Sequence, residues 1–179
     1  VLAGAGRTFC AGLDLTGGGE AFRRAPGAAR SPFQSVVARL MEAAKPVVAR
    51  VQGGAFGAGF GLMVSCDLAV AAAPTRFAVS ELRFGLPPTL IPLGLHHTGR
   101  LGAARPLLMT GAPFDSATAL RCALVQRVVP AEELDAAVQE ACAELLACAP
   151  GAYAQAREIQ RRLPRLSFEE GLRYVGERL

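Results

Sequence analysis

The chain has 179 residues, of which 51% are hydrophobic and 19% are charged, and its formal net charge at pH 7 is +4. This length suits one domain with a sizeable core, and the apolar fraction argues against disorder. The absence of tryptophan and the presence of only two tyrosines argue against a surface that stacks on nucleic-acid bases. No apolar run reaches the roughly 18 residues that a membrane helix needs. We therefore expect neither nucleic acid nor membrane as a partner.

The first half of the chain alternates strand-like and helix-like segments. Residues 1–3 read as the end of a buried strand, and Ser31 followed by Pro32 is typical of the start of a helix. Apolar residues then recur at helical spacing until the pair Lys45-Pro46. Further strands are expected at 46–51, within 66–73 and at 76–80, and a helix at 59–65. This alternation predicts an α/β architecture with parallel strands.

The second half reads as mostly helical. Asp115 or Ser116 is a candidate cap of a short helix that runs to Cys122, and residues 131–149 form an amphipathic pattern with acids in the first turn. Residues 151–163 and 167–179 predict two more helices, which Pro164 separates. No linker divides the chain, so we expect an α/β core over residues 1–130 and a helical region over 131–179 within the same domain.

The cysteines and histidines do not form a metal-binding pattern. The five cysteines are irregularly spaced, no C-x-x-C motif is present, and the two histidines are adjacent at positions 96 and 97. We therefore expect no metal, and free thiols in a reducing compartment. No signal peptide is visible, since Val1 already reads as part of a strand, and this favours a cytoplasmic location.

The glycine-rich stretch 53–61 lies between a strand-like and a helix-like run, and it allows several interpretations. The glycine spacing differs from that of a dinucleotide-binding loop, and no G-K-[ST] follows as in a P-loop. Glycines in such a turn can expose the first N–H groups of a helix, which could hold the oxygen of a carbonyl as it gains charge. A tight helix–strand crossing without a ligand is the remaining alternative.

A second loop, "GRTFCAGLDL", also follows a strand, turns at Gly12 and presents the N–H of Leu13. With this loop, four segments resemble the enoyl-CoA hydratase/isomerase, or crotonase, family. They are "VLAGAGRTFCAGLDL", "KPVVARVQGGAFGAGFGLMVSCDLAVA", "RFAVSELRFGLPPTLIP" and "LMTGAPFDSATALRCALVQRVVP". The resemblance implies a spiral of β-β-α turns and C-terminal helices that build homotrimers or hexamers. It also implies that the family's first strands are missing before Val1.

The resemblance further implies an acyl-CoA thioester as partner, with coenzyme A carried by the substrate and no other cofactor. The thioester oxygen would lie between the N–H groups of Leu13 and Ala58. Residues that match the family's coenzyme A contacts are Ala11, Leu13, Asp14, Leu15, Thr16 and Ala58.

Hydratases of this family commonly use two glutamates. One matching position holds Glu81, and the other holds Gly61, which cannot transfer protons. A carboxylate in an apolar pocket has a raised pKa, which suits a proton carrier. Without the resemblance, the favoured interpretation of Glu81 is an exposed acid at the end of a strand that pairs with Arg83 or Arg76. With it, we assign Glu81, Leu13 and Ala58 as the catalytic groups.

Three functions follow from this assignment. An enoyl-CoA hydratase is the main hypothesis, because the segments around the glycine loop and Glu81 also resemble the bacterial branch that acts on branched, glutaconyl-type CoA esters. A 3-enoyl-CoA to 2-enoyl-CoA isomerase is the second, because moving one proton needs only one carboxylate. A non-catalytic paralogue with a vestigial pocket is the third.

Overall fold

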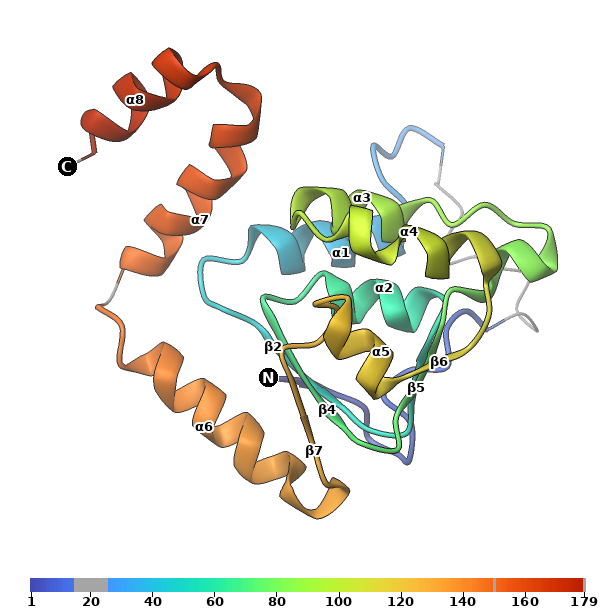
Figure 1. Ribbon diagram of the computed structural model, residues 1–179. Coiled ribbons are helices and arrows are strands. Elements are labelled where there is room, and N and C mark those ends of the chain that lie inside the picture. The colour runs from blue at the N-terminus through green and yellow to red at the C-terminus, as the bar shows by residue number, and fades with distance from the viewer. Residues whose placement is uncertain (15–25, 150, 179) are drawn as a thin grey trace.

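The protein is described by a computed structural model, which covers residues 1–14, 26–149 and 151–178 (Figure 1). Its first sheet has the strand order β1-β2-β4-β7, and every neighbouring pair in it is parallel. The strands are β1 (Leu2–Ala3), β2 (Val48–Val51), β4 (Leu68–Ala72) and β7 (Arg127–Val129). The predicted α/β architecture with parallel strands is therefore confirmed.

A second, smaller sheet continues from the first and has the order β3-β5-β6. Its strands are β3 (Gly54–Phe56), β5 (Arg76–Ala78) and β6 (Phe114–Asp115). The pair β3–β5 is parallel, whereas β5–β6 is antiparallel. Only Gln52 and Gly53 separate β2 from β3, so the chain turns sharply there from the first sheet into the second.

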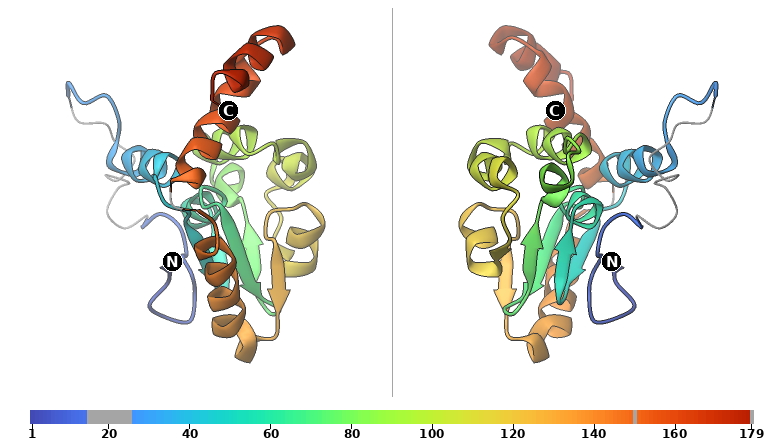
Figure 2. Two further views of the ribbon diagram at one scale, coloured as in Figure 1. Left: turned by 90° about the vertical axis from the view of Figure 1, so that its left-hand side faces the viewer. Right: turned by 90° about the vertical axis from the view of Figure 1, so that its right-hand side faces the viewer.

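Helices cover both faces of the first sheet (Figures 1 and 2). The α-helices are α1 (Pro32–Glu42), α2 (Ala58–Val64), α3 (Leu90–His97), α4 (Leu101–Thr110), α5 (Ser116–Arg121), α6 (Leu134–Leu146), α7 (Ala152–Arg162) and α8 (Phe168–Gly176). Short 3₁₀ turns lie at Ser80–Phe84, Ala131–Glu133 and Leu163–Arg165. The two predicted caps are confirmed: the Ser31 hydroxyl accepts from Gln34 N, and the Asp115 carboxylate accepts from Thr118 N.

Alternation along the strands divides the core into two parts. Val48 and Val70 face α6, where they pack against Leu134 and Val138. On the same strands, Ala49, Val51, Ala69 and Ala71 face the other side of the sheet and join the main core with α2 to α5. Because successive side chains of a strand point to opposite faces, one apolar strand can supply both cores. This explains why β4 reads as a continuous apolar run, whereas β2 carries Arg50, which pairs with Asp135 of α6.

The helices α3 and α4 were not predicted from the sequence. Pro92 and Gly94 interrupt α3, and Pro106 lies inside α4, so local propensity for a helix is weak in both. Burial of Ile91, Leu95, Ala104 and Leu108 in the main core holds these segments as helices instead.

The C-terminal helices α7 and α8 extend beyond the α/β core as an arm (Figures 1 and 2). The arm exposes Phe168 and Leu172 to solvent. Among the described residues, no helix is both long enough and apolar enough to cross a membrane. The predicted trimer or hexamer remains a prediction.

Candidate functional site

The candidate site lies where parallel backbone segments end. Cys10 pairs in parallel with Ala55 of β3, and Ala55 pairs in parallel with Phe77 of β5. Leu13 lies three residues after Cys10, and Ala58 lies three residues after Ala55. Glu81 lies four residues after Phe77. Because parallel segments run in the same direction, their carboxyl ends meet at one edge of the sheet. The fold thus brings the three sequence-predicted catalytic residues to the same edge.

The first loop is fastened to this edge through its backbone. Cys10 N donates to Gly54 O at 3.2 Å, and Phe56 N donates to Cys10 O at 3.0 Å. Gly12 then turns the chain with a φ of +102°, which favours glycine. A methyl group added to Gly12 would lie 2.8 Å from Phe56 O and 3.7 Å from Ala58 N. The loop that carries Leu13 therefore packs directly against the start of α2.

The glycine loop turns at Gly57, where φ is +49° and ψ is −120°. Gly57 N donates to Ala78 O at 2.9 Å, which ties this turn to the end of β5. Ala58 is the first residue of α2, so its N–H has no acceptor within the helix. Among the described residues, neither the N–H of Ala58 nor that of Leu13 donates a backbone hydrogen bond.

The carboxyl group of Glu81 lies beside this turn. Glu81 belongs to the 3₁₀ turn Ser80–Phe84, and a methyl group added to Gly57 would lie 3.5 Å from Glu81 Oε1. Glu81 Oε2 is buried and has no hydrogen-bond partner among the described residues. Burial raises the pKa of Glu81, and a backbone hydrogen bond opposes this shift without reversing it. The site therefore holds a carboxyl group that is partly withdrawn from water.

The alternative interpretation of Glu81 was an ion pair with a nearby arginine. Among the ion pairs of the described residues, none joins Glu81 to Arg76 or Arg83. The side chain of Arg83 instead lies close to Gly111, at the end of α4.

Position 61, which lacks a carboxylate, faces apolar side chains. A methyl group added to Gly61 would lie 3.4 Å from Ile91 Cγ1 and 3.8 Å from Phe33 Cζ. Gly61 N donates to Gly57 O at 3.0 Å, so position 61 lies one helical turn beyond Gly57. The space next to this glycine is thus bounded by α1 and α3.

The remaining predicted coenzyme A contacts are described only in part. Ala11 and Asp14 lie in the first loop on either side of Gly12 and Leu13, and both are exposed. Leu15 and Thr16 fall outside the described residues. The predictions for all of these contacts stand untested.

Asp67 holds the turn between α2 and β4 through its contacts with Val47. Asp67 Oδ2 accepts from Val47 N at 2.7 Å, and Asp67 N donates to Val47 O at 2.9 Å. The other carboxylate oxygen pairs with Arg157 of α7, which also donates to Leu40 O at 3.0 Å and Ala43 O at 2.9 Å. Arg157 therefore joins the C-terminal arm to the core, over a sequence separation that no motif reveals.

Cys66 is one of the free cysteines. It is buried at the end of α2, and burial raises its pKa to about 12. A thiol with such a pKa is almost fully protonated at neutral pH, and the thiolate is the nucleophilic form. No group of three or more metal-ligating side chains lies together in the part of the chain that the structure describes.

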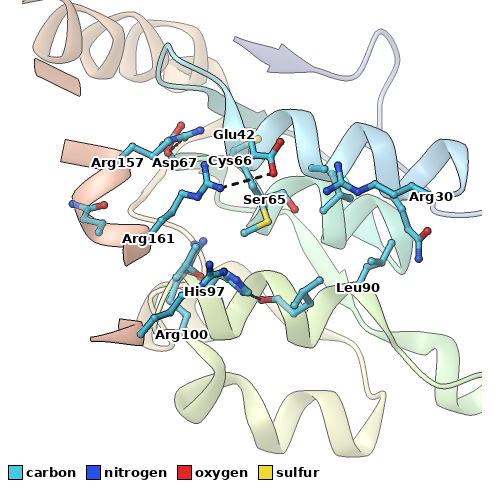
Figure 3. A pocket seen from close by; sticks show the side chains of 18 of the residues that line it. Arg30, Glu42, Ser65, Cys66, Asp67, Leu90, His97, Arg100, Arg157 and Arg161 are labelled. Carbon is cyan, nitrogen blue, oxygen red and sulfur yellow. Dashed lines mark hydrogen bonds and ion pairs between the residues drawn. The ribbon is translucent and has the colours of Figure 1, made fainter. Parts of the chain in front are cut away.

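A cavity of about 680 Å³ lies at the other end of α2 (Figure 3). Its walls come from α1, the end of α2, α3 and the arm helix α7, and they include Arg30, Ser65, His97, Arg100 and Arg161. The walls of this cavity come from segments far apart in the chain, so no local sequence pattern predicts it. Of the two adjacent histidines, His97 lines the cavity, and the sequence assigned no role to it.

Comparison with known proteins agrees with this arrangement. The family model described as enoyl-CoA hydratase/isomerase matches residues 1–173. A carnitinyl-CoA dehydratase from Citrobacter koseri is 34% identical over 98% of this chain and 67% of its own length. A carnitinyl-CoA dehydratase from Proteus mirabilis is 35% identical over the same shares. The chain thus spans about two thirds of the length of these relatives.

Solved structures share the fold as well. The crystal structure of an enoyl-CoA hydratase from Shewanella pealeana superposes with a TM-score of 0.83 at 28% identity, over 97% of this chain and 66% of that one. A Thermobifida fusca protein in complex with acetoacetyl-CoA gives a TM-score of 0.76 at 30% identity, over 96% and 72%. The predicted crotonase-like fold is therefore confirmed. On the family match, the relatives and the fold together, this chain belongs to the enoyl-CoA hydratase/isomerase family.

Proposed function

We propose that the protein is an enoyl-CoA hydratase, which adds water across the 2,3 double bond of an acyl-CoA thioester. The observation that carries this proposal is the position of Glu81, whose carboxyl group lies beside the turn at Gly57 and has a buried oxygen without a hydrogen-bond partner among the described residues. Membership of the family and the names of the relatives support the same reaction class.

In this proposal the N–H groups of Leu13 and Ala58 donate to the thioester oxygen. Attack on C3 of the enoyl group moves electrons onto that oxygen, and the two donors stabilise the resulting enolate. Removing one such donor typically costs about 3–4 kcal/mol of transition-state stabilisation. Two separate loops supply the donors, and their packing at Gly12 and Phe56 holds them together.

One carboxylate can carry both proton transfers in sequence. The ionised Glu81 accepts a proton from water while the water oxygen bonds to C3. The protonated Glu81 then gives that proton to C2 as the enolate collapses. The product gains one OH and one H, and Glu81 returns to its starting state. A pKa raised by burial favours such a group as both acceptor and donor.

Isomerisation is the second candidate, and Gly61 is the observation that favours it. Moving a double bond from the 3,4 to the 2,3 position requires only that a proton leave C2 and return to C4. A single carboxylate suffices for this, and position 61 offers only apolar neighbours, Ile91 and Phe33.

The test is an assay of the purified protein with matched 2-enoyl-CoA and 3-enoyl-CoA esters, with product masses measured in ¹⁸O-labelled water. We expect a product that carries labelled oxygen, and a rate that falls at least about a hundredfold in Glu81→Gln. The control Glu132→Gln removes an exposed acid in the turn before α6 and should keep the wild-type rate.

The outcomes separate the three hypotheses. Turnover of 3-enoyl esters without label would replace hydration by isomerisation. Equal rates for wild type and Glu81→Gln would remove the catalytic assignment, and no turnover of any ester would favour a non-catalytic paralogue.

A second variant tests the meaning of Gly61. Gly61→Glu places a carboxylate one turn beyond Gly57, in a position where the first side-chain carbon meets only ordinary contacts. If hydration is limited by the missing acid, Gly61→Glu should accelerate hydration relative to isomerisation, whereas the isosteric Gly61→Gln should not. Equal ratios for the two variants would show that position 61 does not choose between the reactions.

A further inference from the structure

The cavity at the carboxyl end of α2, called here the arginine cavity, has an unbalanced charge. Its lining residues include five arginines and only two acids: Arg30, Arg100, Arg157, Arg161, Arg165, Glu42 and Asp67. At neutral pH it therefore carries a surplus of three positive charges. Figure 3 shows guanidinium groups from α7 and from the segment after α3 around the same hollow.

Both acids of the cavity are already paired. Asp67 pairs with Arg157, which makes three further hydrogen bonds, to Leu40 O, Ala43 O and Tyr153 Oη. Glu42 lies 3.9 Å from Arg161. Arg157 thus serves the structure, and Arg161 has one exposed carboxylate partner but makes no hydrogen bond among the described residues. Neither acid forms an ion pair with Arg30, Arg100 or Arg165.

The other arginines have donor capacity left. Arg100 donates from Nε to Thr98 Oγ1 and from Nη2 to Val64 O, which leaves Nη1 unused among the described residues. Arg30 and Arg165 form no ion pair among the described residues. A guanidinium offers five N–H donors in a planar fork that matches a carboxylate or a phosphate.

Burial sharpens this imbalance at Arg100. Desolvation lowers the pKa of Arg100, although Cys66 and Asp67 oppose the shift. The charged guanidinium is therefore held where water compensates it poorly, and a bound anion would offset that cost. Apart from the imidazole of His97, no aromatic ring is among the lining residues, so the cavity lacks the cage that quaternary ammonium ligands prefer.

We propose that the arginine cavity binds a small organic anion, and that it holds the anion's carboxylate or phosphate group with Arg100, Arg161 and Arg165. Nothing in this step requires catalysis, so the proposal stands apart from the proposed hydratase activity. The volume of the arginine cavity, about 680 Å³, lies within the range of small-molecule sites.

The anion could come from two sources, because the cavity adjoins the candidate active site. Ser65, which lines the cavity, donates to Gly61 O at 2.7 Å. Leu90 and Gln34 also line it, and they neighbour Ile91 and Phe33, the two side chains beside Gly61. The seven residues of α2 span about 10 Å. The ligand is therefore either a free anion or the distal carboxylate of an extended acyl group.

The first experiment measures binding of free anions by calorimetry at low ionic strength, with octanedioate and inorganic phosphate as probes. Wild type should bind at least one of them, and added salt should weaken the binding. Arg161→Gln and Arg165→Gln should each weaken it about tenfold, since a hydrogen bond to a charged group is lost. Arg105→Gln is the matched control, because Arg105 is an exposed arginine of α4 outside the cavity.

The second experiment distinguishes the tethered source. The Kd values of 2-octenedioyl-CoA and 2-octenoyl-CoA are compared on Glu81→Gln, in which turnover does not interfere. A preference of about tenfold for the dicarboxylic ester, lost when Arg161→Gln or Arg165→Gln is added, would assign the site to the acyl group.

Binding of the free probes with no preference between the esters would assign the site to a free anion. The proposal is overturned if neither the free probes bind nor the esters differ, or if the arginine variants bind as tightly as Arg105→Gln. A protein that fails every hydratase assay but binds octanedioate through Arg161 would refute only the proposed activity.

Discussion

The carboxyl groups at the two ends of α2 differ in their hydrogen bonding. At its start, beside Gly57, the Glu81 carboxyl has a buried oxygen that finds no partner among the residues that the structure describes. At its end, the Asp67 carboxylate accepts from both Val47 N and Arg157. An unpaired buried charge destabilises a fold, whereas a fully hydrogen-bonded one does not when its partners are intact. The ionised Glu81 therefore costs stability at the first end, whereas Asp67 and Arg157 hold the fold together at the second end.

Removing the charge at the structural end should produce the largest effect. Arg157→Met removes the charged partner of Asp67 and the donor to the carbonyl oxygens of Leu40 and Ala43 at the end of α1, so we expect a loss of about 3 kcal/mol in the free energy of unfolding. Urea denaturation measures this loss. The matched control Arg161→Met, one turn further along α7, removes only an exposed pair at 3.9 Å and should cost less than about 0.5 kcal/mol.

A double variant sharpens the result. Adding Asp67→Asn to Arg157→Met should recover part of the lost stability, because no unpaired charge remains. Additive losses would show that the two side chains act independently and do not stabilise the fold as a pair.

Two glycines within α2 should respond differently to the same methyl group. In Gly59→Ala the new carbon would lie 2.4 Å from Cys10 O, so the first loop and α2 must separate, at a cost of about 1–3 kcal/mol. In Gly61→Ala the nearest atom is Ile91 Cγ1 at 3.4 Å, and alanine favours the helix by up to about 1 kcal/mol.

Thermal unfolding of both variants tests this contrast. Gly59→Ala should also lose thioester turnover, because the loop of Leu13 moves away from Ala58. A Gly59→Ala protein as stable and active as Gly61→Ala would show that the two loops are not held in register by this contact.

The smallest effect on stability should come from Glu81 at the start of α2, and there removal of the charge should stabilise the protein. Burial raises the pKa of Glu81 above its ordinary value of 4.5, so the native state binds this proton more readily than the unfolded chain does. Stability from this group therefore decreases as the pH rises from below 4.5 through the native pKa, and the cost is complete above it. Glu81→Gln should become more stable relative to wild type over that range.

Urea denaturation of both proteins below pH 4.5 and at neutral pH checks the sign. Parallel pH profiles would mean that the Glu81 carboxylate is as well solvated in the fold as in the unfolded chain. If wild type instead gained stability relative to Glu81→Gln as the pH rises, a further partner would stabilise the charged form of Glu81.

Sequence determined much of this molecule, because the relevant interactions are local or leave a periodic record. Ser31 before Pro32 indicated the start of α1, a β-branched run indicated β2, and an apolar run indicated β4. The glycine loop, the loop of Leu13 and Glu81 were recognised through four ordered segments, and the family match confirmed that recognition. The glutaconyl-type branch, the trimer and the roles of Leu13, Ala58 and Glu81 stay predictions.

Only the tertiary structure decided how distant segments meet. Local helix propensity is too weak to predict α3 and α4 from the sequence. Burial of residues such as Leu95 and Leu108 stabilises them as helices. Parallel pairing of Cys10, Ala55 and Phe77 brings Leu13, Ala58 and Glu81 to one edge, and Arg157 reaches Asp67 across ninety positions of sequence. Sequence patterns report periodicity within a segment, whereas these contacts depend on how the segments pack, so no local pattern could have placed the arginine cavity.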